Sequence, residues 1–112
     1  IEDIELSGHA GNSQVENATV EIVVLDSNSY LPIRDSNNNL ISIAETSTNN
    51  QGKYNIKYSS SLISDYGINK KYGILLSNKY GNATNITNDT SFNYVFLIVF
   101  DYESITTSQT IH

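Results

Sequence analysis

The chain contains no cysteine, tryptophan or methionine, and only one proline among its 112 residues. The absence of cysteine excludes disulfides, thiolate metal sites and thiol redox chemistry, on which many small extracellular domains depend. Charged residues make up only 16% of the chain, and 12 acidic side chains outnumber six basic ones. Clustered lysine and arginine, which attract nucleic acids and anionic lipids, are therefore lacking, and we expect neither kind of partner.

Long apolar runs are also absent. The longest, residues 94–100, is far shorter than the ~20 residues of a membrane-spanning helix, so we expect no membrane span in this chain. The sequence does not begin with methionine and shows no signal peptide. We expect Ile1 to be the first residue of a processed protein or of an excised segment. The length fits a single domain, residues 1–112.

Apolar residues alternate with a period of two, which is typical of strands. The pattern predicts a first strand around Ile4 and Leu6, then strands at 15–25, 40–48, 52–58, 71–78 and 92–102. Residues 59–68 favour a loop over a helical turn, and the polar tail 103–112 is expected to be extended or frayed. Six or seven strands without a convincing helix predict an all-β fold, a single antiparallel β-sandwich of the immunoglobulin or prealbumin kind.

The last strand is apolar on both faces, whereas a sandwich strand normally buries only one. We assign Val95, Leu97 and Val99 to the core and Phe96, Ile98 and Phe100 to the other face. An uncharged, doubly apolar strand would be prone to aggregate at an open edge, so a loop or another subunit must cover it. The full predicted core is Val20, Ile22, Val24, Ile43, Tyr54, Ile56, Leu75, Val95, Leu97 and Val99.

Four N-x-Thr triplets match the acceptor pattern for N-linked glycosylation, at Asn17, Asn82, Asn85 and Asn88. Fifteen asparagines and nine threonines would give about one such triplet by chance. The last three triplets are contiguous in a polar segment that is expected to be a loop. We therefore predict N-linked glycans and an extracellular or cell-surface location; the alternative is a polar Asn/Thr loop without glycans.

Enzymatic motifs are not recognisable, because His9 and His112 belong to no catalytic pattern and the glycines lie at turn positions. We expect a protein that is not an enzyme and has no cofactor. Asp35, Asn37 and Asn39 alternate like the first ligands of a calcium loop, but Leu40 replaces the glycine of such loops. The alternative is a turn stabilised by Asp and Asn side chains. Tyrosines could form a sugar-binding platform, although those at 54 and 58 fit a buried strand face better.

Two motifs in order carry a family resemblance. The first is V-x-x-A-x-V-x-I and the second is T-x-x-x-G-x-Y-x-I; they comprise Val15, Ala18, Val20, Ile22, Thr48, Gly52, Tyr54 and Ile56. The pattern resembles the carboxypeptidase-regulatory-like, transthyretin-like β-sandwich modules, which include collagen-adhesin B-type repeats, over about half the chain. The resemblance implies a stalk, spacer or adhesive module outside the cell. The first strand lacks the lysine with which some relatives form an isopeptide bond, and residues 25–40 are a longer insertion than usual.

The composition also resembles glycosylated archaeal surface-filament subunits, such as those of thread-type pili, which join by donating a terminal strand. We therefore predict a structural subunit of a surface filament or stalk, whose partners are copies of itself assembled head to tail. Residues 1–10 are the expected exchanged strand, with Ile1, Ile4 and Leu6 contacting Phe96, Ile98 and Phe100 of a neighbour. The alternatives are an adhesin module that binds carbohydrate or a host ligand, and an accessory domain of a secreted hydrolase.

Overall fold

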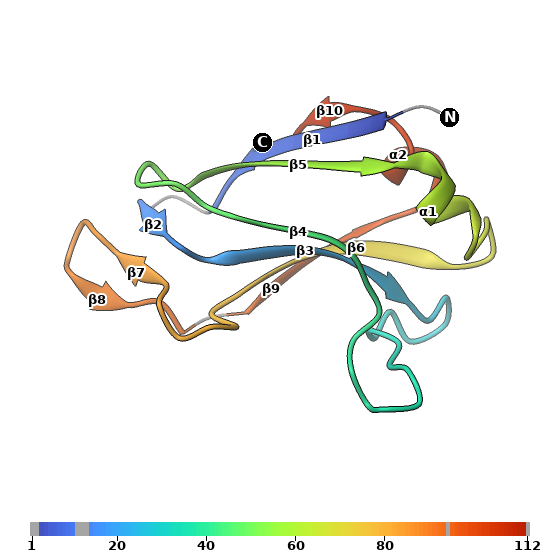
Figure 1. The fold of residues 1–112 in the computed structure, drawn as a ribbon, viewed down its shortest axis with the longest axis horizontal. Helices are drawn as coiled ribbons and strands as arrows, with labels where there is room; N and C mark the ends of the chain where they lie inside the picture. The colour runs from blue at the N-terminus through green and yellow to red at the C-terminus, as the bar shows by residue number, and fades with distance from the viewer. Residues whose placement is uncertain (1–2, 11–13, 94, 112) are drawn as a thin grey trace.

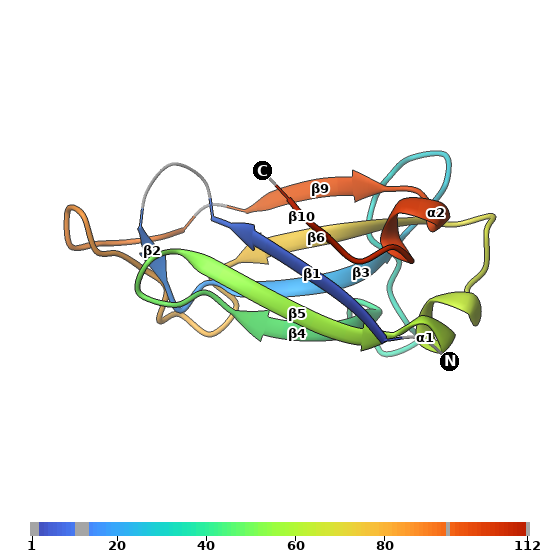
Figure 2. The same ribbon diagram turned by 90° about the horizontal axis from the view of Figure 1, so that it is seen from above.

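The structure, a computed structural model, describes residues 3–10, 14–93 and 95–111, so the predicted assembly residue Ile1 lies outside the described part. Strands make up 48% of the described residues and helices 9%, as predicted for an all-β sandwich. The described part contains ten strands, more than the six or seven expected, because several connections form short two-residue strands. Figure 1 shows two layers of strands, and Figure 2 shows the same layers from above.

The upper layer in Figure 1 is a three-stranded sheet with the order β10-β1-β5. Its strands are β1 (Asp3–His9), β5 (Lys53–Ser59) and β10 (Gln109–Thr110). The lower layer has the order β4-β3-β6-β9. Its strands are β3 (Thr19–Leu25), β4 (Ser42–Ser47), β6 (Lys71–Ser77) and β9 (Phe96–Phe100). A small sheet of β2 (Val15–Glu16), β7 (Thr84–Asn85) and β8 (Thr90–Ser91) lies at one end.

The upper sheet follows the alternation of its sequence. In β5, Tyr54, Ile56 and Tyr58 are buried while Asn55 and Lys57 between them are exposed, which confirms the predicted inward face. β1 runs antiparallel to β5, and its Leu6 lies opposite Ile56. Ile4 and Leu6 are buried in the core, so β1 and β5 together cover the inner face of the lower sheet.

Strand β3 is buried along its whole length because both of its faces are covered. Val20, Ile22 and Val24 belong to the core between the two sheets. On the outer face, Val23 forms a second apolar cluster with Leu25 and Leu75, against which Leu40 and Leu97 pack. Residues 26–39, the predicted insertion between Leu25 and Leu40, fold back to this face, and Pro32 bridges to Leu25. The insertion therefore covers one end of the outer face of the lower sheet.

The predicted core face of the last strand is wrong. In β9, Leu97 lies opposite Leu75 and Ile98 opposite Ile74, so Phe96, Ile98 and Phe100 share the inner face with the core. Val95 and Val99 are exposed, and Leu97 packs on the outer cluster. A shift of one residue exchanges the two faces of a strand, and a sequence that is apolar on both faces does not specify which turns inward. Ile43 is only partly buried, at the margin of the core.

Two short helices replace predicted irregular segments. Helix α1 (Ser60–Ser64) lies where we favoured a loop; the Ser59 side chain caps it and Ile63 is buried. Helix α2 (Tyr102–Ile105) lies in the tail that was expected to be extended or frayed. The Asp101 carboxylate accepts from the Ser104 amide, 2.8 Å away, as an N-terminal cap. Ile105 is fully buried, so the tail returns to the core and continues into β10.

Candidate functional site

The free edge of β9 is the first candidate surface. β9 ends the sheet order and, in the described part of the chain, pairs only with β6. Its apolar side chains are unusually accessible: Ile98 is 44% exposed, Val99 45% and the neighbouring Val95 66%. Phe96 is 52% exposed, and its ring lies against that of Phe92 with centroids 6.2 Å apart. An apolar strand at an edge is a template for pairing with another strand.

Charge distinguishes β9 from the other long edge strands. β9 reads FLIVF and carries no charged residue. By contrast, β4 carries Glu45 at the other edge of the same sheet, and β5 carries Lys53 and Lys57 at the edge of the upper sheet. Charged side chains protect an edge from pairing with another chain. β9 therefore lacks the protection that β4 and β5 have.

The predicted donor strand occupies a place in its own sheet. β1 lies between β5 and β10, and all seven of its residues have register partners in β5. Ile4 is 2% exposed and Leu6 is fully buried. This arrangement corresponds to the alternative to strand donation: β1 completes the sandwich of its own chain. Donation would require β1 to leave this position and the same strand of a neighbour to replace it.

The second candidate surface is the end of the molecule that carries the glycan-acceptor motifs. The contiguous motifs form a hairpin of β7 and β8 rather than an irregular loop, with Asn82 before it and Asn88 in its turn. Both of these side chains are exposed, while Asn85 is half-buried and accepts from the Thr87 amide, 3.1 Å away. Figure 1 shows this hairpin extending from one end of the sandwich.

Asn17 joins the same end although it lies far away in sequence. β2 pairs with β7, which places Glu16 opposite Thr84. Between β2 and β3, Asn17 adopts a positive φ of 64°, a conformation that asparagine tolerates better than most residues. The buried Thr48 hydroxyl donates to the Val15 carbonyl and accepts from the Ala18 amide, at 2.6 and 3.0 Å. Thr48, which belongs to the second sequence motif, thus stabilises the interruption between β2 and β3 at which Asn17 is exposed to solvent.

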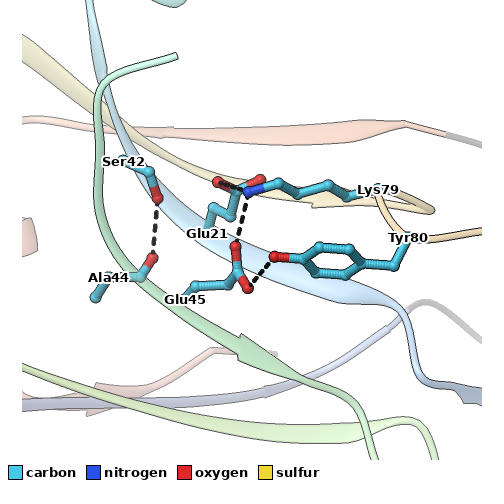
Figure 3. Close-up of polar contacts among 6 residues, drawn as sticks. All are labelled: Glu21, Ser42, Ala44, Glu45, Lys79 and Tyr80. Carbon is cyan, nitrogen blue, oxygen red and sulfur yellow. Dashed lines mark hydrogen bonds and ion pairs between the residues drawn. The ribbon is translucent and has the colours of Figure 1, made fainter. Parts of the chain in front are cut away.

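A polar cluster crosses the outer face of the lower sheet beside this end (Figure 3). Glu21 and Glu45 lie directly opposite each other on β3 and β4. Lys79 reaches between them, with its Nζ atom 3.4 Å from Glu21 and 2.9 Å from Glu45. The Tyr80 hydroxyl donates to the other oxygen of Glu45, 2.8 Å away. Glu21 is only 2% exposed, so Lys79 compensates a buried charge.

The hydrogen bonds in this cluster shift the pKa values of Glu45 and Lys79. The hydrogen bond from Lys79, and then that from Tyr80, lowers the pKa of Glu45 below its usual 4.5. The hydrogen bond to Glu45 in turn raises the pKa of Lys79. Glu45 and Lys79 therefore keep their ordinary charge states near neutral pH. The arrangement stabilises the fold and fixes Tyr80 beside the acceptor end.

Two hollows adjoin the cluster. A groove of ≈ 570 Å³ lies between the insertion and the outer face of the lower sheet, and Glu21, Arg34, Leu40, Leu75, Lys79 and Val95 are among its lining residues. A smaller hollow of ≈ 310 Å³ has Glu45 and Tyr80 among its lining residues. Asn17 and Asn82 both line this second hollow. The structure thus brings together two predicted glycan acceptors that are 65 positions apart in the printed sequence.

The predicted calcium residues lie in a tight turn of the insertion. One carboxylate oxygen of Asp35 accepts from the backbone amides of Asn37 and Asn39, at 2.9 and 3.0 Å. Arg34 donates to the Asn38 carbonyl, 2.9 Å away, and places a positive charge at the same turn. These contacts belong to the alternative interpretation, a turn stabilised by an Asp side chain. Calcium binding stays a prediction.

Metal clusters and membrane-spanning helices are not found among residues 3–10, 14–93 and 95–111. These residues contain no group of three or more His, Cys, Asp or Glu side chains placed to hold a metal ion. None of the described helices is long and apolar enough to cross a membrane. In comparisons with family models, with curated proteins and with solved structures, nothing matches this chain. The resemblance to transthyretin-like modules therefore stays a prediction.

Glycan occupancy is expected to follow exposure. We expect Asn17, Asn82 and Asn88 to be modified more completely than the half-buried Asn85, because the transferase needs an accessible acceptor side chain. Peptide mass spectrometry of protein from its native cells, after enzymatic glycan release, measures each site. The exposed Asn28, which lies in no acceptor motif, is the internal control. Recovery of the bare polypeptide mass would contradict the prediction.

Proposed function

We propose that the chain is a non-enzymatic structural module of an extracellular surface filament or stalk, in which copies associate through the free edge of β9. The observation that carries the proposal is the edge itself: an uncharged strand whose apolar side chains are exposed on both faces. A strand from another copy would satisfy the edge backbone groups and remove apolar surface from water. The formal net charge of −6 makes an uncharged strand the favourable place for identical chains to meet.

The end of the molecule that carries the glycan-acceptor motifs supports the proposal that the module is extracellular. Glycans on Asn17, Asn82 and Asn88 would cover the small sheet and leave the edge of β9 accessible. Because the glycans would cover one end of the molecule and leave the apolar edge strand accessible, copies would associate only through that edge. The sandwich carries no disulfide, since the chain has no cysteine, and contacts between copies would add stability outside the cell.

A second candidate function is an adhesin module that binds carbohydrate or another small polar ligand. The groove beneath the insertion favours it, because Arg34, Glu21 and Lys79 surround an apolar floor that includes Leu75. Polar groups around an apolar surface are the usual composition of a ligand site. Such a module would stay monomeric and bind an immobilised glycan array, whereas a filament module would self-associate.

The edge proposal is tested by placing a charge on it. We expect wild-type protein to associate in a concentration-dependent way in analytical ultracentrifugation, and native material to form polymers in electron micrographs. Ile98→Lys should weaken association at least tenfold, because pairing would bury an uncompensated charge. Ile68→Lys is the matched control, since Ile68 is 75% exposed and lies in the loop between α1 and β6. A wild-type chain that remains monomeric up to millimolar concentration would refute the proposal.

A further inference from the structure

We propose that two copies of this chain pair through β9 itself, antiparallel, about a two-fold axis at Ile98. The inference rests on the proposed function and names the strand that occupies the free edge. It begins from the sequence of β9, which reads Phe-Leu-Ile-Val-Phe from Phe96 to Phe100. The order is nearly the same when read backwards, with a large aromatic residue at each end and branched aliphatic residues between them.

Antiparallel pairing about Ile98 places like side chains opposite each other. Ile98 meets the partner copy's Ile98, Phe96 meets its Phe100, and Leu97 meets its Val99. The register with β6 shows that Phe96, Ile98 and Phe100 face the inner side and Leu97 and Val99 the outer side. Apolar residues therefore continue across the junction on both faces. A two-fold contact requires such a self-complementary surface, because each residue meets its counterpart twice.

Charges next to the strand are compatible with this register. Asp101 follows β9 directly and would lie opposite the partner copy's Val95, after which the chain turns into α2. In this register no two acidic side chains lie directly opposite each other. Such a pair of like charges would destabilise the contact. The joined sheets would run β4-β3-β6-β9 and then continue through the partner's β9, β6, β3 and β4 in reverse order. Both open edges of the new eight-stranded sheet are then β4, which carries Glu45.

The pairing would cover the exposed apolar edge that makes β9 prone to aggregate. Ile98 and Val99 are 44% and 45% exposed in the single chain, and the partner strand would lie beside both. A two-fold pair is closed and does not propagate by itself. It would join modules of two neighbouring stalks or filaments side by side, and growth along a filament would require a second contact elsewhere on the molecule.

Engineered disulfides test the register, because the chain has no cysteine of its own. Opposite residues of an antiparallel pair have Cα atoms about 4.5–5.5 Å apart, within the range that a disulfide spans. Ile98→Cys should therefore form a covalent dimer with itself under mild oxidation of dilute protein. Phe96→Cys should not, because its two copies would be displaced by four residues, about 13 Å along the strands. Mixing Phe96→Cys with Phe100→Cys should restore the crosslink.

The controls distinguish this inference from the proposed function. Each variant is first checked for a wild-type thermal transition, and Ile68→Cys measures crosslinking by random collision. The expected result is at least a tenfold excess of crosslinked dimer for Ile98→Cys and for the mixed pair over Ile68→Cys and over Phe96→Cys alone. If the wild type associates but this pattern is absent, the two-fold register is wrong and the edge proposal stands. If the wild type does not associate, both are wrong.

Discussion

Deleting residues 1–9 is expected to leave the chain unfolded. The deletion removes β1, the middle strand of the upper sheet, and separates β5 from β10. It also removes Ile4 and Leu6 from the core, and losing either side chain alone costs about 2–5 kcal/mol. The total is comparable with the ~5–15 kcal/mol by which a domain of this size is stable. Near-ultraviolet circular dichroism and the loss of a cooperative melting transition would show the result.

Adding the missing strand as a separate peptide provides the control. A synthetic peptide of residues 1–10 should restore the cooperative transition of the truncated chain, whereas the same peptide with Leu6→Asp should not. Restoration would show that β1 binds in trans, as head-to-tail exchange between copies requires. A truncated chain that folds alone with nearly wild-type stability would contradict the expected result. It would also mean that β1 is dispensable to its own sandwich and free for donation.

Replacing Tyr72 with alanine is expected to cost about 3–5 kcal/mol, as for other large buried aromatic residues. Tyr72 is fully buried on the inner face of β6, and its ring lies 6.3 Å from that of Tyr102 in α2. Its hydroxyl donates to the Gly67 carbonyl, 2.5 Å away, and so ties the segment after α1 to the core. Burial, reinforced by Tyr102 and Tyr66, raises the pKa of Tyr72 to about 12. Urea denaturation monitored by circular dichroism measures the loss.

Two variants separate the contributions of the ring and the hydroxyl. Tyr72→Phe keeps the ring and leaves the Gly67 carbonyl without this donor, so it should cost only about 1–2 kcal/mol. Tyr66→Ala is the matched surface control, because Tyr66 is 40% exposed and should change stability by less than about 0.5 kcal/mol. A loss below about 1 kcal/mol for Tyr72→Ala would contradict its position at the centre of the core.

The sequence was sufficient to predict which face of a strand is buried where the other face is polar. β5 alternates lysine or asparagine with tyrosine or isoleucine, and its inward face was predicted correctly. β9 offers no such contrast, and only its register with β6 determines which side is buried. The two helices were missed for a related reason: each is too short to show a helical period, and tertiary burial of Ile63 and Ile105 stabilises them.

The polar cluster was not predicted. Glu21 lies in β3, on the face opposite Val20 and Ile22. Nothing local in the sequence pairs it with Lys79, which is 58 residues away, or with Glu45. These contacts depend on strand order and register, which follow from long-range pairing. The grouping of Asn17 with the later acceptor motifs has the same origin.

The parallel pairing of β1 with β10 has a mechanical consequence. β10 follows α2 and runs beside β1 in the same direction, with Leu6 opposite Gln109 and the Ile111 amide donating to the Ser7 carbonyl, 2.7 Å away. Tension applied between the first and last residues would pull these two strands past each other along their length. The contacts between them then resist together in shear, instead of opening one after another as in a peeled hairpin. A module loaded in this way resists stretching along a stalk better than one whose terminal strands unzip.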